Sequence, residues 1–513
     1  MENRINKRKF CFIICVNNEG YLEECLWYID RISVPDGYEK EHVVIRDAKS
    51  MTSGYNQAMK LTDAKYKIYI HQDVLLVNVN LLSQLLTAFE DPSVGMVGVL
   101  GKRKFILSAE YSEHWDTGAV EVCNGTNAIY FNFSPEAKGW TGVTAIDGMF
   151  MATQYDIPWD EKHFDGWDFY DISQCEQFRR VGYRIVVPGI SSLEGNWAFH
   201  DVGQCKYDGW EHYRRIFCEE YEDQGYHYTT AEWVKHRDEI REKQNQIMNV
   251  FSANDFNKAG EMLMQLETGE MNFQLAQVAC YLVIMGEELS AYGGIMSSVL
   301  QEFDEFVREY EQVKFALRRS YFEERSGAWA PLQNRLRAGK ISMKFLWVAA
   351  HESVADPNRL WWRVFAEYQK EIRELMKQGE ILEAERLLQQ MDEKWRGRDG
   401  NIFLILIYVF RREVESGMQR TVFDDFGNPD DMIQHFIRLK LYLRRIEFGL
   451  AEKYQREVYD YCIQTGVSDH LIFHMIQNNI FYREQFCRNL SRLFEREEGE
   501  DSMRAKLYKQ LAN

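Results

Sequence analysis

The sequence predicts an α/β amino-terminal domain with a mostly parallel sheet over residues 1–235, followed by an all-α helical domain over residues 236–513. Up to about residue 200, short apolar runs of strand length alternate with helical patterns. After about Tyr221, apolar residues instead recur at steps of three and four, which is typical of amphipathic helices. A chain of 513 residues also exceeds what one hydrophobic core usually supports, so more than one domain is expected.

The amino-terminal domain begins with a strand, helix, strand, helix, strand pattern. Its segments are KFCFIICV (9–16), YLEECLWYIDRI (21–32), HVVIRD (42–47), GYNQAMKLTD (54–63) and YKIYI (66–70). Right-handed crossovers of this kind place the strands parallel in one sheet, with helices on both faces. Because such sheets bind ligands beyond the carboxyl ends of their strands, we expect the site residues to follow strands.

The helical region contains two similar segments. Residues 252–267 and 377–392 align without gaps, which matches Ala259 with Ala384 and Leu263 with Leu388. This similarity predicts helix-turn-helix units that resemble tetratricopeptide-type repeats, with an irregular helical bundle as the alternative. Extended helical surfaces suit binding, so we expect this region to bind a partner molecule or a second copy of the chain as a homodimer, and to take no part in chemistry.

The composition excludes several classes of protein. The 61 basic and 79 acidic residues leave a net charge of −18, which disfavours nucleic acid as a partner. The ten cysteines form no CxxC pair and no metal-finger spacing, which favours a reducing, cytoplasmic environment. The longest later apolar stretch, residues 402–410, is far shorter than the roughly 18 residues of a membrane span, so we expect no transmembrane segment.

Polar residues follow the first two strands of the predicted sheet. The first strand ends at Val16, and Asn18 and Glu19 lie at the turn into the helix, where they either face a ligand or cap the helix. The second strand ends with Arg46 and Asp47. An aspartate there can bind the imide edge of a pyrimidine, and the arginine can bind phosphates; alternatively, the two residues pair with each other at the surface.

The third strand runs directly into His71, Gln72 and Asp73. A carboxylate just past a buried strand, with a histidine two residues back, is well placed to hold a divalent cation. The alternative is a polar turn after the strand.

This order of parts resembles the family 2 glycosyltransferases of the GT-A fold, which is Rossmann-like. In that family a run from an Asn-x-Ala motif to an Asp carries the metal, and Asn56, Ala58, Tyr66 and Asp73 fill its places. His71 stands where the wider family has Asp. The runs HQDV, VTAIDGMFMAT and FDGWDFYDISQCEQFRRVGYRIVVP resemble a subgroup named after a streptomycin-biosynthesis protein, in which the histidine is usual. The resemblance covers about residues 9–220.

The resemblance implies transfer of a sugar from a nucleoside-diphosphate donor, a UDP-sugar first, with inversion at the anomeric carbon and with Mn²⁺ or Mg²⁺ as cofactor. It implies that His71, Asp73 and His200 hold the metal. The residues that it assigns to the nucleotide site are Val16, Asn18, Glu19, Arg46, Asp47, Asn56, Gln72 and Asp73.

Two further carboxylates match catalytic positions of that family. Asp147 matches an Asp-Gly pair near the sugar and the acceptor; the alternative is a turn whose glycine needs unusual backbone angles. Asp171 matches the catalytic Asp of the family's Glu-Asp pair, and Tyr170 stands in place of the Glu. This match implies that Asp171 is the general base. The alternative role for Asp171 is a helix cap.

The expected acceptor is a peptide or protein side chain, because a transferase domain fused to a repeat-like helical domain resembles bacterial peptide and protein glycosyltransferases. A cell-surface glycan or a natural product is the alternative acceptor. A nucleotidyltransferase is a second hypothesis, but its glycine-rich basic loop after the first strand is absent from the sequence. A third is a non-catalytic helical scaffold that carries a degenerate transferase domain.

Overall fold

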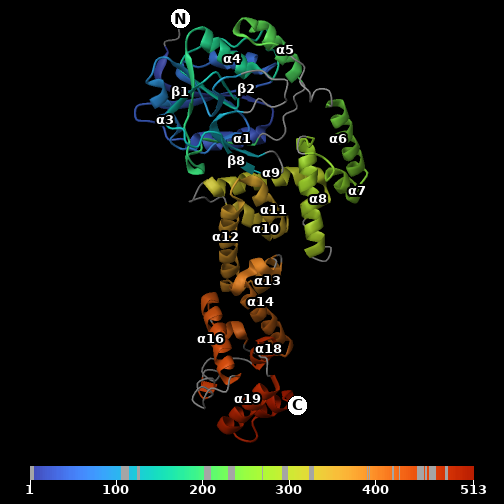
Figure 1. Ribbon diagram of the computed structural model, residues 1–513. Helices are drawn as coiled ribbons and strands as arrows, with labels where there is room; N and C mark the ends of the chain where they lie inside the picture. Colours follow the sequence, from blue (N-terminus) through green and yellow to red (C-terminus); the bar gives the residue numbers. More distant parts are fainter. Residues whose placement is uncertain are drawn as a thin grey trace. The chain divides into compact units, whose positions relative to one another are not determined.

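The structure of the chain is a computed structural model (Figure 1). It describes residues 5–105, 115–123, 128–201, 209–228, 237–267, 270–291, 298–322, 329–389, 391, 393–418, 421–426, 428–447, 456, 459–460, 469–479 and 483–512. In Figure 1 the strands carry the blue and green colours of the first part of the chain, whereas the yellow to red part is helical. The predicted α/β domain followed by a helical region is confirmed.

The main sheet has seven strands in the order β2-β1-β3-β11-β5-β12-β9. Five strands share one direction, and β11 and β9 run opposite to them. The five are β1 (Asn6–Val16), β2 (Glu39–Arg46), β3 (Ala64–His71), β5 (Val94–Gly98) and β12 (Arg184–Pro188), and the two are β9 (Trp140–Val143) and β11 (Phe150–Thr153). The sheet is therefore mostly parallel in strand direction, as predicted.

Helices cover both faces of this sheet, which explains why the carboxyl-terminal part of β1 is apolar on both of its faces. Alternate residues of β1 enter opposite cores: Phe12 and Ile14 pack in one core, and Cys11 and Ile13 pack in the other. The first core includes residues of α1 (Glu19–Arg31) and α3 (Leu81–Phe89), and the second includes residues of α2 (Met51–Met59) and α4 (Tyr170–Arg180). This two-sided burial holds the carboxyl ends of the strands in place.

A second sheet of six strands lies beyond the end of β3. Its order is β10-β6-β7-β13-β4, with β8 paired to β7. The strands are β4 (Val74–Leu76), β6 (Leu100–Lys102), β7 (Thr117–Cys123), β8 (Ala128–Asn132), β10 (Ala145–Ile146) and β13 (Ala198–His200). The antiparallel pairing of β13 with β4 brings residue 200 beside the segment that follows β3.

The described residues after β13 form helices and short turns. They are α5 (Trp210–Glu220), α6 (Arg237–Ser252), α7 (Phe256–Leu263), α8 (Phe273–Ala291), α9 (Phe303–Phe322), α10 (Trp329–Arg337), α11 (Met343–Ser353), α12 (Pro357–Lys377), α13 (Ile381–Gln389), α14 (Glu393–Glu415), α15 (Val422–Phe426), α16 (Pro429–Glu447), α18 (Asp469–Asn479), α19 (Arg483–Glu498) and α20 (Met503–Leu511). None of the helices in the described part combines the length and apolarity that a membrane span requires.

The chain divides into two compact units by its internal contacts. The first contains Met1–Ile341 and Phe345–Trp361, and the second contains Ser342–Lys344 and Trp362–Asn513. Helices α6 to α11 thus belong almost entirely to the unit that contains the sheets. The boundary between the amino-terminal and helical domains at residues 235/236 stays a prediction.

Both segments of the predicted repeat adopt the same local structure. Each contains the end of a helix, a short turn and a second helix: α6 and α7 in the first copy, α12 and α13 in the second. Ala259 and Ala384, which the alignment matches, are both fully buried. A small buried residue allows a close helix contact, so the two units share a helix-turn-helix design, while the tetratricopeptide assignment stays a prediction.

Candidate active site

The carboxyl ends of β1, β2 and β3 meet at one edge of the main sheet. The strand register pairs Val16 with Arg46 and Cys15 with His71. A pocket of about 380 Å³ opens at this edge, within the usual size range of small-molecule sites. Its lining residues are Cys15, Val16, Asn17, Asp47, Ala48, Met51, His71, Gln72, Asp73 and Trp167.

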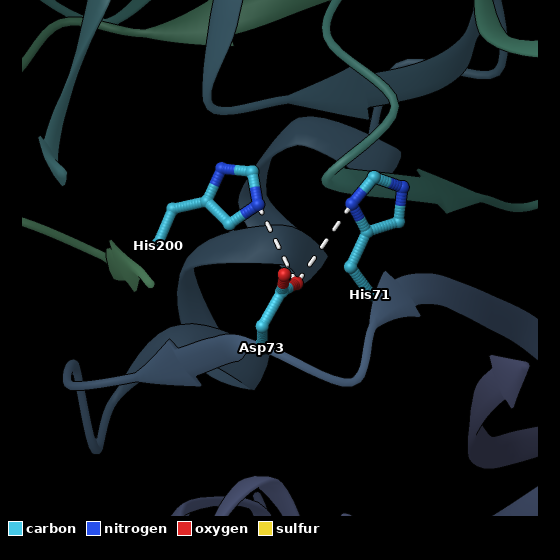
Figure 2. Close-up of side chains that lie close together, drawn as sticks. All are labelled: His71, Asp73 and His200. Carbon is cyan, nitrogen blue, oxygen red and sulfur yellow. Dashed lines mark ion pairs between the residues drawn. The ribbon is translucent and has the colours of Figure 1, made fainter. Parts of the chain in front are cut away.

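His71, Asp73 and His200 form a cluster beside this pocket. Their nearest ligand atoms all lie within 4.8 Å of one another. Figure 2 shows the two imidazole rings on either side of the Asp73 carboxylate, with Asp73 Oδ1 at 3.5 Å from His200 Nε2 and 4.0 Å from His71 Nδ1. Two ligand atoms on one cation are about 4 Å apart at most, so these side chains are spaced much as the ligands of one bound metal ion are.

Two buried atoms of the cluster fit a cation. Asp73 Oδ1 and His200 Nε2 are buried and have no hydrogen-bond partner. Burial opposes ionisation of Asp73, but the two histidines outweigh it and lower its pKa. Burial lowers the pKa of His71, which favours the neutral imidazole that binds metals, whereas the Asp73 carboxylate outweighs burial and raises the pKa of His200. One carboxylate and two imidazoles make a suitable donor set for a divalent transition metal.

Tyr170 orients one of these ligands. Its hydroxyl is hydrogen-bonded to His71 Nε2. When Nε2–H donates to the Tyr170 oxygen, Nδ1 presents its lone pair toward Asp73, which is the usual way in which a second partner fixes a metal-binding histidine. The two positions at which the chain departs from the wider family pattern, His71 and Tyr170, therefore contact each other.

Asp171 and Asp147 lie close enough to Tyr170 for both charges to act on its hydroxyl. The N–H groups of Gly148 and Ile172 each donate to a different oxygen of Asp171, both at 2.9 Å. Burial and the neighbouring Asp147 raise the pKa of Asp171 to about 7. The carboxyl is thus poised to exchange a proton near neutral pH.

The alternative roles considered for these two carboxylates fit the geometry only in part: Asp147 accepts from the Met149 N–H at 2.9 Å, as a turn aspartate does, whereas Asp171 does not occupy the cap position of its helix. The cap position of α4 is Phe169, and no side chain caps the helix. Gly148 is not among the described glycines with positive φ. It is required instead by close approach, because an added Cβ would lie 2.6 Å from the Tyr170 ring and 2.9 Å from the Asp171 Cβ.

The exposed side of the edge contains residues that already bind one another. Asn18 caps α1 by accepting from the N–H groups of Gly20 and Tyr21, at 2.9 and 3.2 Å. Arg46 donates to both oxygens of Glu19, at 2.6 and 2.9 Å, so it pairs with Glu19 rather than with Asp47. Both side chains of this pair are more than half exposed. In this structure, none of these three side chains lines the pocket.

The remaining nucleotide-site candidates differ in position. Gln72 lines the pocket, and its Oε1 accepts from the N–H groups of Asn17 and Asn18 at 3.0 Å each. Asp47 also lines the pocket and has a φ of 58°, a strained conformation of the kind that gathers at functional sites. Asn56 is buried away from the pocket lining, where it bonds the backbone of Trp159.

Trp167 is a pocket residue that sequence reasoning missed. Its side chain is 53% exposed and lines the pocket together with Met51 and Asp47. It lies in the segment between β11 and α4, far along the chain from the other lining residues. An aromatic side chain inside the FDGWDFYD run was the available signal, because small-molecule pockets are commonly lined by aromatic side chains.

The sequence similarity to known proteins covers this part of the chain. Residues 11–221 match the model of a family described as "Glycosyltransferase like family". The amino-terminal part of the chain is therefore similar in sequence to glycosyltransferase-like domains. The matched range contains all three residues of the cluster as well as Asp147 and Asp171. No curated protein matches the chain by sequence.

The chain is also similar to solved structures of other proteins. One is residues 1–349 of Staphylococcus aureus TarS, which is 11% identical and has a TM-score of 0.26, with 66% of this chain and 90% of that one covered. The same TarS fragment has been solved with UDP and with UDP-GlcNAc. Another is the mannosyltransferase PcManGT of Pyrobaculum calidifontis in complex with GDP-Man and Mn²⁺, which is 11% identical, with a TM-score of 0.26 and coverage of 70% and 88%.

Proposed function

We propose that the chain is a metal-dependent inverting glycosyltransferase that moves a sugar from a nucleoside-diphosphate donor, a UDP-sugar first, to an acceptor. The observation that carries the proposal is the cluster of His71, Asp73 and His200 beside the pocket, with two buried ligand atoms that pair with each other and have no hydrogen-bond partner. The glycosyltransferase-like domain and the pocket at the carboxyl edge of the sheet support the same function.

His71, Asp73 and His200 would hold the cation. Imidazole ligands favour a transition metal such as Mn²⁺ over Mg²⁺, which prefers oxygen ligands. A cation bound there would neutralise the negative charge that develops on the diphosphate as it leaves. Tyr170 keeps the His71 ring oriented toward the cluster, and Gln72 keeps the turn after β1 in place at the pocket wall.

Asp171 would act as the general base. The acceptor oxygen or nitrogen attacks the anomeric carbon from the face opposite the diphosphate, and the carbon–oxygen bond to the phosphate breaks with its electron pair. The acceptor proton passes to Asp171. Because attack and departure take place on opposite faces in a single displacement, the configuration at the anomeric carbon inverts. A pKa of about 7 makes this carboxylate a stronger base than an ordinary surface aspartate. Asp147, which neighbours Asp171, would contact the sugar or the acceptor.

The acceptor that we propose first is a peptide or protein side chain, because the helical units that follow the catalytic domain suit extended polypeptide binding. A glycan or natural product is the alternative acceptor.

The function is tested by incubating the full chain with MnCl₂ and a panel of UDP- and GDP-sugars. Release of the nucleoside diphosphate reports donor hydrolysis, and intact-mass measurement of candidate peptide and glycan acceptors reports transfer. We expect manganese-dependent release from at least one donor. A chain that binds and hydrolyses none of the donors would refute the proposed activity and favour the scaffold hypothesis.

A further inference from the structure

A buried polar network joins helix α9 to the end of strand β13. Arg318, which is fully buried, donates from Nη1 to Asp201 Oδ2 at 2.6 Å and from Nε to the Ser353 carbonyl at 2.9 Å. Lys314, one turn earlier, brings its ammonium to 3.7 Å from the other oxygen of Asp201. The Tyr21 hydroxyl donates to Asp201 Oδ2 at 3.2 Å. Losing one partner of such a network is costly, because the remaining charge stays buried.

Apolar contacts fix the same helix against the glycosyltransferase-like domain. The Phe315 ring lies edge-on to Tyr21 at 5.4 Å, and Phe322 lies edge-on to Phe199 at 6.2 Å. The Arg318 guanidinium lies over the Phe199 ring, 4.4 Å from its centroid. Helix α9 is thus packed on β13, the strand that contains His200.

The network reaches the candidate metal cluster through the backbone. Asp201 directly follows His200, and its N–H donates to the Asp73 carbonyl at 2.9 Å. This hydrogen bond continues the β13–β4 pairing to the point where both ligands leave the sheet. The position of Asp201 therefore affects the spacing between His200 Nε2 and Asp73 Oδ1, and Arg318 fixes the position of Asp201.

We propose that Arg318 is a positioning residue of the metal site: it holds Asp201, and through Asp201 it holds His200 and Asp73 at the separation that one cation requires. The inference rests on the proposed function, since it requires the cluster to bind a cation. It also departs from the expectation that the helical region takes no part in chemistry, because Arg318 belongs to that region. The distance between ligands determines metal affinity, and partners behind the ligands typically change it about 10- to 100-fold.

Arg319 provides a matched control on the same helix. Its Nε donates to Glu24 Oε1 at 3.2 Å, so it also pairs with a carboxylate that is fully buried. Glu24 lies on α1, and in the described part of the chain its hydrogen bonds and ion pair are with Arg319 and not with the cluster. Arg318→Met and Arg319→Met therefore each remove a guanidinium from α9 and leave a buried acid behind, but only the first loosens Asp201.

The experiment measures Mn²⁺ binding to the full-length protein by electron paramagnetic resonance of free Mn²⁺, without donor or acceptor. We expect Arg318→Met to raise the Mn²⁺ Kd about 10- to 100-fold and Arg319→Met to change it less than about threefold. Arg318→Lys keeps a charge beside Asp201 but cannot bond Asp201 and the Ser353 carbonyl in the same way, so we expect an intermediate Kd. This variant also provides the test if Arg318→Met does not fold.

Two results overturn the inference in different ways. Equal shifts of the Mn²⁺ Kd in the Arg318 and Arg319 variants, with tight binding by the wild type, would show that α9 supports the fold in general and that Arg318 has no special role. A wild-type chain that binds no Mn²⁺ would instead remove the metal site itself, and the inference would fall with the proposed cofactor.

Discussion

The carboxyl edge of the main sheet has a buried half and an exposed half, and the two use polar side chains differently. In the exposed half, Asn18 caps a helix and Arg46 pairs with Glu19, so each of these side chains already has a protein partner. In the buried half, Asp73 Oδ1 and His200 Nε2 form an ion pair at 3.5 Å, and neither atom has a hydrogen-bond partner. Buried polar atoms without hydrogen bonds are costly, so their presence indicates a ligand more strongly than polarity alone does.

The largest effect that we expect comes from the buried half. Asp73→Ala removes the central ligand of the cluster, and we expect it to lower the transfer rate by roughly a thousandfold or more, because a bound cation supplies several kcal/mol. Calorimetry of UDP binding with and without MnCl₂ checks the cause: the variant should lose the response to manganese. Asp91→Ala is the control, since Asp91 is half exposed and precedes β5 at the opposite edge. A manganese response like that of the wild type would contradict the assignment of Asp73.

The next effect concerns the base. Asp171→Asn keeps the size of the side chain but removes its basicity, so we expect kcat to fall roughly a hundredfold while UDP-sugar binding is retained. Asp165→Asn is the control, because Asp165 accepts a hydrogen bond from the Tyr213 hydroxyl at 2.8 Å and is separate from Asp147 and Gly148.

The pH profile sharpens this assignment. The base must be deprotonated, and the pKa of Asp171 is about 7, so kcat of the wild type should rise with pH up to about 7 and then level off. The groups that face this carboxyl are Asp147, whose charge raises its pKa, and the N–H groups of Gly148 and Ile172, which lower it. The residual rate of Asp171→Asn should lack this rise. Turnover by Asp171→Asn close to that of the wild type would mean that another residue is the base.

A smaller effect is expected where the two halves meet, at Asp47. Asp47→Gly removes the carboxylate and suits the positive φ of this position, so it tests the side chain without adding backbone strain. We expect the donor KM to rise about tenfold or more, as for the loss of one hydrogen bond to a charged group, while the acceptor KM changes little. Asp47→Asn, which also tolerates this φ, should have an intermediate donor KM. A larger rise in the acceptor KM would place Asp47 outside the nucleotide site.

The smallest effect is expected in the exposed half. Arg46→Ala breaks the pair with Glu19, and an exposed ion pair contributes little to the free energy of unfolding because solvent screens it. We expect little change in the melting temperature and less than about a fivefold rise in the donor KM. A rise as large as that of Asp47→Gly would show that Arg46 leaves Glu19 to bind the phosphates, and it would remove the contrast between the two halves.

The sequence was sufficient for features that depend on local pattern. The alternation of short apolar runs with helical patterns predicts β1, β2 and β3. The parallel order of these strands places His71 and Asp73 at the edge where the pocket lies. The pairing of β13 with β4, which brings His200 to Asp73, joins segments far apart in the chain and leaves no local pattern. Two other contacts also join distant segments and leave no local pattern. They are the buried hydrogen bonds between Asn56 and Trp159 and the ion pair between Arg318 and Asp201.

The hydrogen bond between His71 and Tyr170 has a consequence for how related sequences diverge. Each side chain is placed by the other, so replacing His71 alone would leave a buried hydroxyl without its hydrogen-bond partner, and replacing Tyr170 alone would release the imidazole. Substitutions at positions in contact are not additive. The two positions should therefore change together. A sequence that has only one of the two residues, His71 or Tyr170, and a carboxylate at the other position should function less well than a sequence with both residues or with both carboxylates.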